Sequence, residues 1–385
     1  MKTLKLLAFS LVALFLVGCE LPDDSTSTGE GGEVVIPEEG PYLHASKKII
    51  YDNGKDATTF TFYYDGEVVE SGYEIYLGEN PFEGKTFTST TQGDYIFWAS
   101  YGTINSNEVT ISVIQTPPAA PAAPEDTNPS KTNFTRRVLL TQFTGTGCGY
   151  CPNMMNILYT LSNNEQMSKK FVIAAAHLFN DTDPAYLDSA QTLDNMMAVP
   201  GYPSIFSDLD KASATGASMA DVTSMINSAY DREMVRGGIA VNSEYHAEEG
   251  YIVLTATVKA RTTTGFRIGA WLLEDNIFGL QGNNGITAVE GLNFNYHNNC
   301  IRIADSKYTD LDYTGYSLGV IEAGKTASRE FAFKLKTNGD GNATRWNHDN
   351  LRVIVFISTK EGNKWLVNNV VKCPKDGSVD FEYVN

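Results

Sequence analysis

The chain has 385 residues, with 46 acidic and 29 basic side chains and a formal net charge of −17 at pH 7. Such a length predicts more than one domain, and the acidic excess argues against nucleic-acid binding and against a basic membrane-binding face. The sequence carries no nucleotide, haem or metal signature, so we expect no cofactor and no metal site.

The first 18 residues have the pattern of a lipoprotein signal peptide. Lys2 and Lys5 precede an apolar run over residues 6–17, which is too short to span a bilayer comfortably. The run ends in Leu-Val-Gly-Cys, a lipobox in which Cys19 is acylated and becomes the mature N-terminus. Because several acyl chains anchor a protein firmly, we expect this lipid anchor to be the membrane attachment.

Residues 19–41 are rich in acidic, Ser, Thr and Gly residues and contain no Lys or Arg, which predicts a disordered tether. Residues 42–115 then contain short β-rich runs, such as the alternating TFTFYY at 59–64, separated by Gly, Asn, Asp and Pro. This spacing is typical of a β-sandwich. The run GDYIFWASYG at 93–102 resembles the penultimate strand of bacterial Ig-like domains, in which an aromatic side chain faces the core.

Residues 116–135 are predicted to form a linker. Between Thr116 and Pro129, proline recurs at a density that excludes helix and sheet and favours polyproline II. Such a segment is a semi-rigid spacer, and it marks the clearest domain boundary in the chain.

Residues 136–236 alternate between strand and helix patterns. Strands are expected at 137–143, 171–177 and 202–206, and helices at 152–161, from Asp183-Pro184 onward, and from Ser218 to about 234. The order β-α-β-α-β-(β)-α is that of a thioredoxin fold. We therefore expect a central thioredoxin-like α/β domain.

Residues 237–385 return to β patterns, with strand-like runs at 253–261, 267–273, 326–336 and 351–358. These predict a C-terminal β-sandwich domain. The expected fold class is thus multidomain α+β, with an N-terminal Ig-like β-sandwich, a central thioredoxin-like α/β domain and a C-terminal β-sandwich.

Cys148-Gly149-Tyr150-Cys151 is the motif that carries chemistry. A CxxC at a helix N-terminus supplies a thiolate, Cys148, that the helix dipole and free amide groups stabilise. Cys151, three residues on, lies on the same face and can resolve a mixed disulfide. Zinc sites use CxxC too, but zinc needs two further ligands, and His177 is the only nearby candidate.

The segment around the motif resembles thioredoxins over about 100 residues. The resemblance implies that Pro203, which opens the later strand, is cis and lies against the disulfide, and that Tyr202 and Pro203 line the substrate groove. The pair Gly-Tyr between the cysteines is found in bacterial periplasmic disulfide isomerases. Two positions depart from thioredoxins: Gly147 replaces a tryptophan, and Gln142 replaces the buried acid that accepts the proton of the resolving cysteine.

A second resemblance covers residues 136–385 and is to the Omp28-related outer membrane lipoproteins of the Bacteroidetes. It rests on QFTGTGCGYCPNM, VPGYPSIF, LLEDNIFGLQ, YHNNCIRIAD and NLRVIVFIS, which begin at residues 142, 199, 272, 296 and 350. It implies a lipoprotein of the outer membrane that faces the periplasm or the cell surface. It does not imply an activity.

Four cysteines remain after Cys19, and export implies an oxidising compartment in which Cys148 and Cys151 pair. Cys300 and Cys373 are either a structural disulfide or two buried free thiols. His177 and His297 are interpreted as a strand-end and a loop histidine.

Two functions remain open. The first is a thiol–disulfide oxidoreductase or isomerase with Cys148 as nucleophile, Cys151 as resolving thiol and a protein thiol or disulfide as partner. The second is a non-enzymatic surface binding or assembly lipoprotein in which the CxxC is a structural disulfide.

Overall fold

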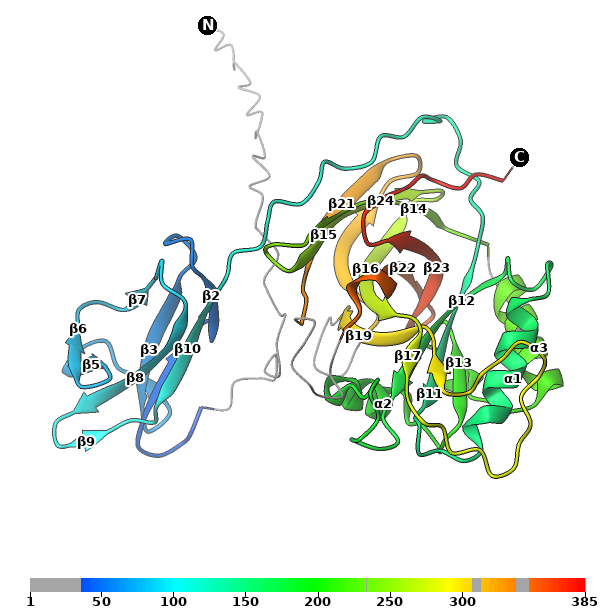
Figure 1. Cartoon of the computed structure of the whole chain (residues 1–385). Helices are drawn as coiled ribbons and strands as arrows, with labels where there is room; N and C mark the ends of the chain where they lie inside the picture. The colour runs from blue at the N-terminus through cyan, green and yellow to red at the C-terminus, as the bar shows by residue number, and fades with distance from the viewer. Residues whose placement is uncertain (1–35, 233, 307–312, 337–345, 385) are drawn as a thin grey trace, which may run out of the picture.

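The structure is a computed structural model that describes residues 36–232, 234–306, 313–336 and 346–384. Cys19, the signal peptide and most of the acidic tether lie outside the described residues. The described chain is mostly β, with a few helices and several sheets (Figure 1). Among these residues no helix combines the length and the apolar character needed to cross a membrane.

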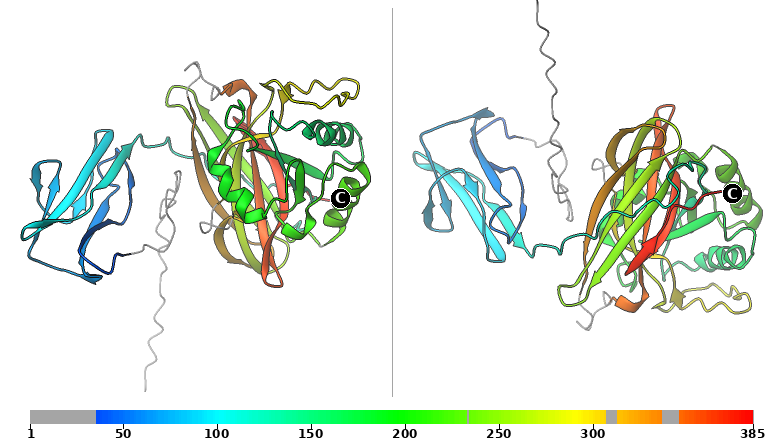
Figure 2. Two further views of the ribbon diagram at one scale, coloured as in Figure 1. Left: turned by 90° about the horizontal axis from the view of Figure 1, so that it is seen from below. Right: turned by 90° about the horizontal axis from the view of Figure 1, so that it is seen from above.

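The N-terminal strands form a separate body that residues 116–135 join to the rest (Figure 2). These strands form two sheets. The first sheet consists of β1 (Pro41–Ala45), β3 (Thr58–Tyr64), β4 (Glu67–Val68) and β7 (Thr86–Phe87). The second sheet consists of β2 (Ile49–Tyr51), β10 (Val109–Ile114), β8 (Gly93–Tyr101), β5 (Tyr73–Leu77), β6 (Asn80–Phe82) and β9 (Ile104–Asn105). Phe60 and Phe62 of one sheet share a core with Phe97 and Ile111 of the other. Phe97 is fully buried, so the prediction of a core-facing aromatic in residues 93–102 is confirmed.

Residues 116–135 contain no helix and only an isolated bridge at Phe134, as the prolines predict. They lie against β15 (Tyr251–Ala260) instead of spanning free space, because Thr255 and Lys259 hydrogen-bond to Pro121 and Asp126. All ten residues of β15 are buried. The linker therefore covers a face of the sheet as well as joining two parts of the chain.

A mixed sheet of eight strands forms the centre of the molecule. Its first three strands are β13 (Ser204–Ser207), β11 (Val138–Thr144) and β12 (Phe171–His177), with β11 parallel to β12 and antiparallel to β13. Every residue of these strands is buried because helices cover both faces. One face packs against α1 (Cys151–Ser162) and α3 (Met219–Arg232), and the other against α2 (Gln191–Met197).

The same sheet continues into the C-terminal region. Ala175 of β12 pairs with Cys300 of β19 (Cys300–Asp305). Beyond β19, the strand order continues with β16 (Thr264–Glu274), β22 (Leu351–Glu361) and β23 (Lys364–Pro374). β20 (Tyr316–Ile321) also pairs with β16. A second sheet of β21 (Thr326–Lys334), β15, β14 (Gly237–His246) and β24 (Gly377–Val379) packs on its far part. The predicted boundary at residue 236 is thus crossed by one continuous sheet, while the four strand-like runs predicted after it are confirmed as parts of β15, β16, β21 and β22.

The predicted helix start at Asp183-Pro184 is wrong. Helical structure begins later, with a 3-10 turn at Asp188–Ala190 that leads into α2. The Asp183 carboxylate does not cap a helix, because it accepts hydrogen bonds from the backbone N–H groups of Ala185 and Thr146. The Asp-Pro pair therefore makes an Asx turn fixed by tertiary contacts.

Cys300 and Cys373 are buried free thiols, so the disulfide between them is not formed. Cys300 lies on β19 and Cys373 on β23, with β16 and β22 between them. Three strand spacings of about 4.8 Å separate the two positions by roughly 14 Å. A disulfide needs Cα atoms within about 7 Å of each other.

Candidate functional site

The Cys148–Cys151 disulfide lies where β11 leads into α1. Cys151 is the first residue of α1, and Pro152 in the first turn suits a helix start because its missing N–H would have no helical partner. The two sulfur atoms are bonded and the Cα atoms are 5.4 Å apart. Cys148 is 2% exposed and Cys151 is fully buried, whereas Tyr150 between them is 65% exposed.

The local electrostatics favour a thiolate at Cys148 once the disulfide is reduced. The first turn of α1 contains no acidic residue, so its free N–H groups and its dipole present uncompensated positive potential. Cys148 precedes this turn, and its carbonyl oxygen accepts from the N–H of Cys151 at 3.1 Å. The helix start can therefore stabilise a Cys148 thiolate.

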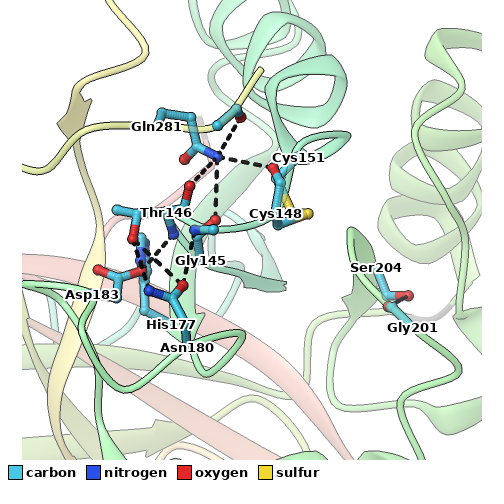
Figure 3. Close-up of a disulfide and its surroundings, with 12 residues drawn as sticks. Gly145, Thr146, Cys148, Cys151, His177, Asn180, Asp183, Gly201, Ser204 and Gln281 are labelled. Atoms are coloured by element: carbon cyan, nitrogen blue, oxygen red, sulfur yellow. Dashed lines mark hydrogen bonds and ion pairs between the residues drawn. A yellow bond between two sulfur atoms is a disulfide. The ribbon is translucent and has the colours of Figure 1, made fainter. Parts of the chain in front are cut away.

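The Tyr202-Pro203 peptide bond is cis, as the thioredoxin resemblance implies. Pro203 immediately precedes β13, whose Ser204 pairs with Phe143 of β11, so it lies at the sheet edge from which the CxxC loop starts. Figure 3 shows the sulfur atoms on the side of that loop that faces Gly201 and Ser204. The Tyr202 hydroxyl donates a hydrogen bond to Asp194 at 2.7 Å. The pKa of Tyr202 is raised, mainly by burial and to a smaller extent by this hydrogen bond.

The two departures from thioredoxins have structural consequences. Gln142 is buried in β11 and offers no group that could accept a proton at neutral pH. At Gly147 the backbone N–H donates to Asn180 Oδ1 at 2.9 Å, and an added Cβ would lie 2.9 Å from that oxygen and 3.0 Å from Phe179 Cδ1. Phe179 and Asn180 therefore occupy space that a side chain at residue 147 would need.

Replacing Gly147 with tryptophan, the residue of thioredoxins, should destabilise this protein by about 1–3 kcal/mol, because Phe179 and Asn180 would be displaced. Gly216→Ala is the matched control, since a Cβ there meets no atom within 4 Å. Thermal unfolding of the two variants measures the difference. Equal melting temperatures would show that the loop adapts to the larger residue.

A buried cluster behind the CxxC loop is not apparent from the sequence. His177 Nδ1 lies 2.8 Å from Asp183 Oδ2, and His177 Nε2 lies 3.5 Å from Cys300 Sγ. The same Asp183 oxygen accepts from the N–H of Thr146 at 2.7 Å, so the cluster is joined to the CxxC loop (Figure 3). Only the strand-end position of His177 hinted at it, because Cys300 is 123 residues away in the sequence.

The protonation states within this cluster follow from its contacts. Burial opposes a charge on His177, but Cys300 and Asp183 together raise the pKa of His177 to about 10. Burial likewise opposes ionisation of Asp183, yet His177 and two backbone N–H groups lower its pKa to about 2. His297, whose ring meets that of His177 edge to face at 5.1 Å, has its pKa lowered to about 4 by burial and by the nearby His177 charge. His177 is thus cationic, Asp183 anionic and His297 neutral at pH 7.

The loop between β17 (Ile277–Phe278) and β18 (Tyr296–His297) also reaches the site, and we call residues 279–295 the strap. Gln281 Nε2 lies within hydrogen-bonding distance of the carbonyl oxygens of Gly145, Thr146 and Cys148. This contact could not be predicted from the sequence, because the strap has no local pattern that indicates a partner. Among the described residues, no group of three or more His, Cys, Asp or Glu side chains is arranged to hold a metal ion.

Three comparisons with known proteins bear on identity. Residues 190–375 match the family model described as outer membrane protein Omp28; this range includes Pro203, the strap and Cys300 but not the CxxC motif. A structure of HBP35 of Porphyromonas gingivalis aligns with a TM-score of 0.49 and 19% identity over 66% of this chain and 81% of that chain.

A structure of three N-terminal domains of the bacteriophage RB49 outer capsid protein Hoc aligns with a TM-score of 0.14 and 6% identity, over 90% of this chain and 99% of that chain. Neither structural likeness is close enough to carry an argument, and no curated protein matches the sequence. The family match alone bears on the assignment: residues 190–375 of this chain match the model of the Omp28 family of outer membrane proteins.

Proposed function

We propose that this Omp28-family protein is anchored to the outer membrane by lipid at Cys19 and exchanges disulfides with protein partners in the cell envelope. The observation that carries the proposal is the Cys148–Cys151 disulfide at the N-terminus of α1. The order β11–α1–β12–α2–β13–α3 supports a thioredoxin-like unit around it. The shared core of the two N-terminal sheets supports an Ig-like domain, and the packing of the second C-terminal sheet supports a β-sandwich.

In the proposed reaction, the reduced protein acts first through Cys148. Its thiolate attacks one sulfur of a partner disulfide, forms a mixed disulfide and releases the other partner sulfur as a thiolate. The Cys151 thiolate then attacks Cys148 Sγ, which re-forms the internal disulfide and releases the second partner sulfur. Two partner thiols are produced and two protein thiols are oxidised; the reverse sequence oxidises the partner.

The direction of exchange depends on how Cys151 loses its proton. In the reductive direction Cys151 must become a thiolate, and Gln142, which stands where thioredoxins have a buried acid, cannot take that proton. In isomerisation, Cys148 alone can attack a partner disulfide and later leave the mixed disulfide when a partner thiolate attacks it, so Cys151 is not needed. The residues at this site therefore favour oxidation or isomerisation over rapid reduction, and Tyr202 and Pro203 are the groups that we expect to line the partner groove.

The proposal is tested with a disulfide-bonded reporter peptide whose fluorescence rises on cleavage. Reduced wild-type protein should exchange with it, Cys148→Ser should lose all exchange, and Cys151→Ser should accumulate a mixed disulfide detectable by mass spectrometry. Cys373→Ser is the matched control, because this buried thiol belongs to the C-terminal sandwich core. Absence of exchange by the wild-type protein, or exchange by Cys148→Ser, would contradict the proposal.

A second candidate is a binding or assembly protein with a structural disulfide. It is favoured by the burial of both cysteines, with Cys148 only 2% exposed. Under this function, replacing both cysteines with serine should leave partner capture intact and lower stability by about 2 kcal/mol. A reduction potential below about −300 mV would also favour it, since structural disulfides lie in that range.

A further inference from the structure

We propose that Gln281 is a positioning residue of the Cys148–Cys151 site, and that the strap makes this site composite, with one wall supplied by the C-terminal region. The inference rests on the proposed disulfide exchange and names a residue that sets its redox equilibrium. It concerns a side chain 133 residues away from Cys148 in the sequence.

Gln281 meets the CxxC loop through three backbone carbonyl groups. Its Nε2 lies 3.3 Å from Gly145 O, 3.1 Å from Thr146 O and 2.9 Å from Cys148 O, and it also lies 2.9 Å from Gly282 O of the strap itself (Figure 3). An amide nitrogen carries only two protons, so these oxygens share the donors of one group. The loop that presents Cys148 is thereby closed around a single side chain.

The strap holds Gln281 in place. The backbone N–H of Gln281 donates to Asn295 Oδ1 at 3.0 Å, and the N–H of the next residue, Gly282, donates to Thr146 O at 2.8 Å. Further along, Asn156 of α1 donates to Thr287 O and accepts from the N–H of Val289, both at 2.9 Å. The strap is thus joined to both the CxxC loop and the helix that follows it.

The strap also contacts the residues between the cysteines. A Cβ added at Gly149 would lie 2.4 Å from Asn284 Oδ1, which leaves room for glycine only unless Asn284 moves. Tyr150 remains exposed beside this contact. The side of the CxxC loop that the strap covers is therefore closed to a partner disulfide.

The donors of Gln281 have a defined electrostatic effect on Cys148. Carbonyl oxygens carry partial negative charge and disfavour a nearby thiolate, and a hydrogen-bond donor between them offsets that potential. Gln281 therefore stabilises the reduced form of the cysteine pair. Gln281→Glu replaces the donor with an anion, whereas Gln281→Lys supplies a cationic donor, so the two changes should act in opposite directions.

The test is the equilibrium of the full-length, detergent-solubilised protein with glutathione, in which two glutathione thiols become one glutathione disulfide as Cys148–Cys151 is reduced. Thiols are trapped by alkylation, and the peptide that contains both cysteines is quantified by mass spectrometry. Gln281→Ala should lower the equilibrium constant about three- to tenfold, Gln281→Glu should lower it further, and Gln281→Lys should raise it. A tenfold change corresponds to about 30 mV.

Asn283→Ala is the matched control, because the Asn283 side chain bonds to Gly285 within the strap and not to the CxxC loop. Its equilibrium constant should stay within about twofold of wild type. A shift of the Glu and Lys variants in the same direction, or an Ala variant within that twofold range, would overturn the inference. If the Gln281 variants fail to fold, Asn156→Ala, which frees the strap from α1, should lower the constant and an unchanged value would overturn the inference.

This equilibrium needs no protein partner, so the two proposals fail separately. The Cys148–Cys151 pair could equilibrate with glutathione, with a constant that changes in the Gln281 variants, and yet exchange with no reporter peptide. That result would contradict the proposed function and support this inference. If the protein exchanges with the reporter peptide but the Gln281 variants leave the glutathione equilibrium unchanged, the inference about Gln281 fails and the proposed function stands.

Discussion

Replacing Asp183 with alanine should lower the free energy of unfolding of the central unit by about 3–5 kcal/mol, the usual cost of leaving a buried charge without its partner. His177 would stay in the interior with its Nδ1 unpaired, and the N–H groups of Thr146 and Ala185 would lose their acceptor. Because the N-terminal unit can unfold separately, hydrogen exchange of the β11 and β12 amides is the appropriate measurement.

Asp181→Ala is the control for this experiment, since Asp181 lies in the same turn but is exposed. Its effect should stay within about 0.5 kcal/mol. Similar protection losses in both variants would mean that the turn is sensitive to any substitution, and the His177–Asp183 pair would not be its main support.

The pair also predicts how the effect of Asp183→Ala varies with pH. The pKa of Asp183 is lowered to about 2, so its contribution is present above the unfolded value near 4 and is lost as the pH falls toward 2. The pKa of His177 is raised to about 10, so its contribution is present below about 6.5 and is lost as the pH rises toward 10. The stability difference between wild type and variant should therefore be largest between about pH 4 and 6.5.

The sequence was informative where the pattern was local. The apolar, β-rich pattern of β11 and the buried-strand pattern of β12 predict two strands, and both strands are buried throughout. The CxxC before an apolar helix period predicts a disulfide at a helix start, which is where α1 begins. Asp183-Pro184 shows the limit, because the same two residues open a helix or make an Asx turn, and contacts with Thr146 and His177 decide between them.

The candidate site could be predicted only in part, because many of its contacts come from segments that are distant in the sequence. β19 follows β18 in the chain, but its place beside β12 depends on the match of two buried faces and not on any local signal. That pairing brings Cys300 to His177. The return to β patterns after residue 236 is equally compatible with a separate C-terminal sandwich, which is why the sequence predicted a domain boundary there.

The second large effect is expected at Asp208, which joins three parts of the central unit. Its fully buried carboxylate accepts from Arg136 at 2.9 Å, from Arg232 of α3 at 3.3 Å and from the N–H of Leu139 in β11 at 3.0 Å. Arg136 is itself only 6% exposed and also binds the carbonyl groups of Ala229 and Asn368, so it fixes α3 and β23 as well.

Asp208→Ala should therefore destabilise the central unit by about 3–5 kcal/mol, because the Arg136 charge would remain buried without its counter-ion. Asp210→Ala is the matched control two residues away: its contacts with Lys364 and Arg232 are longer, at 3.4 and 3.9 Å, and Lys364 is exposed. Urea unfolding followed by hydrogen exchange of β11 and α3 measures both variants.

The double variant Arg136→Met, Asp208→Ala removes both charges and should recover part of the lost stability. A double variant no more stable than Asp208→Ala would show that packing, and not the unpaired charge, causes the loss.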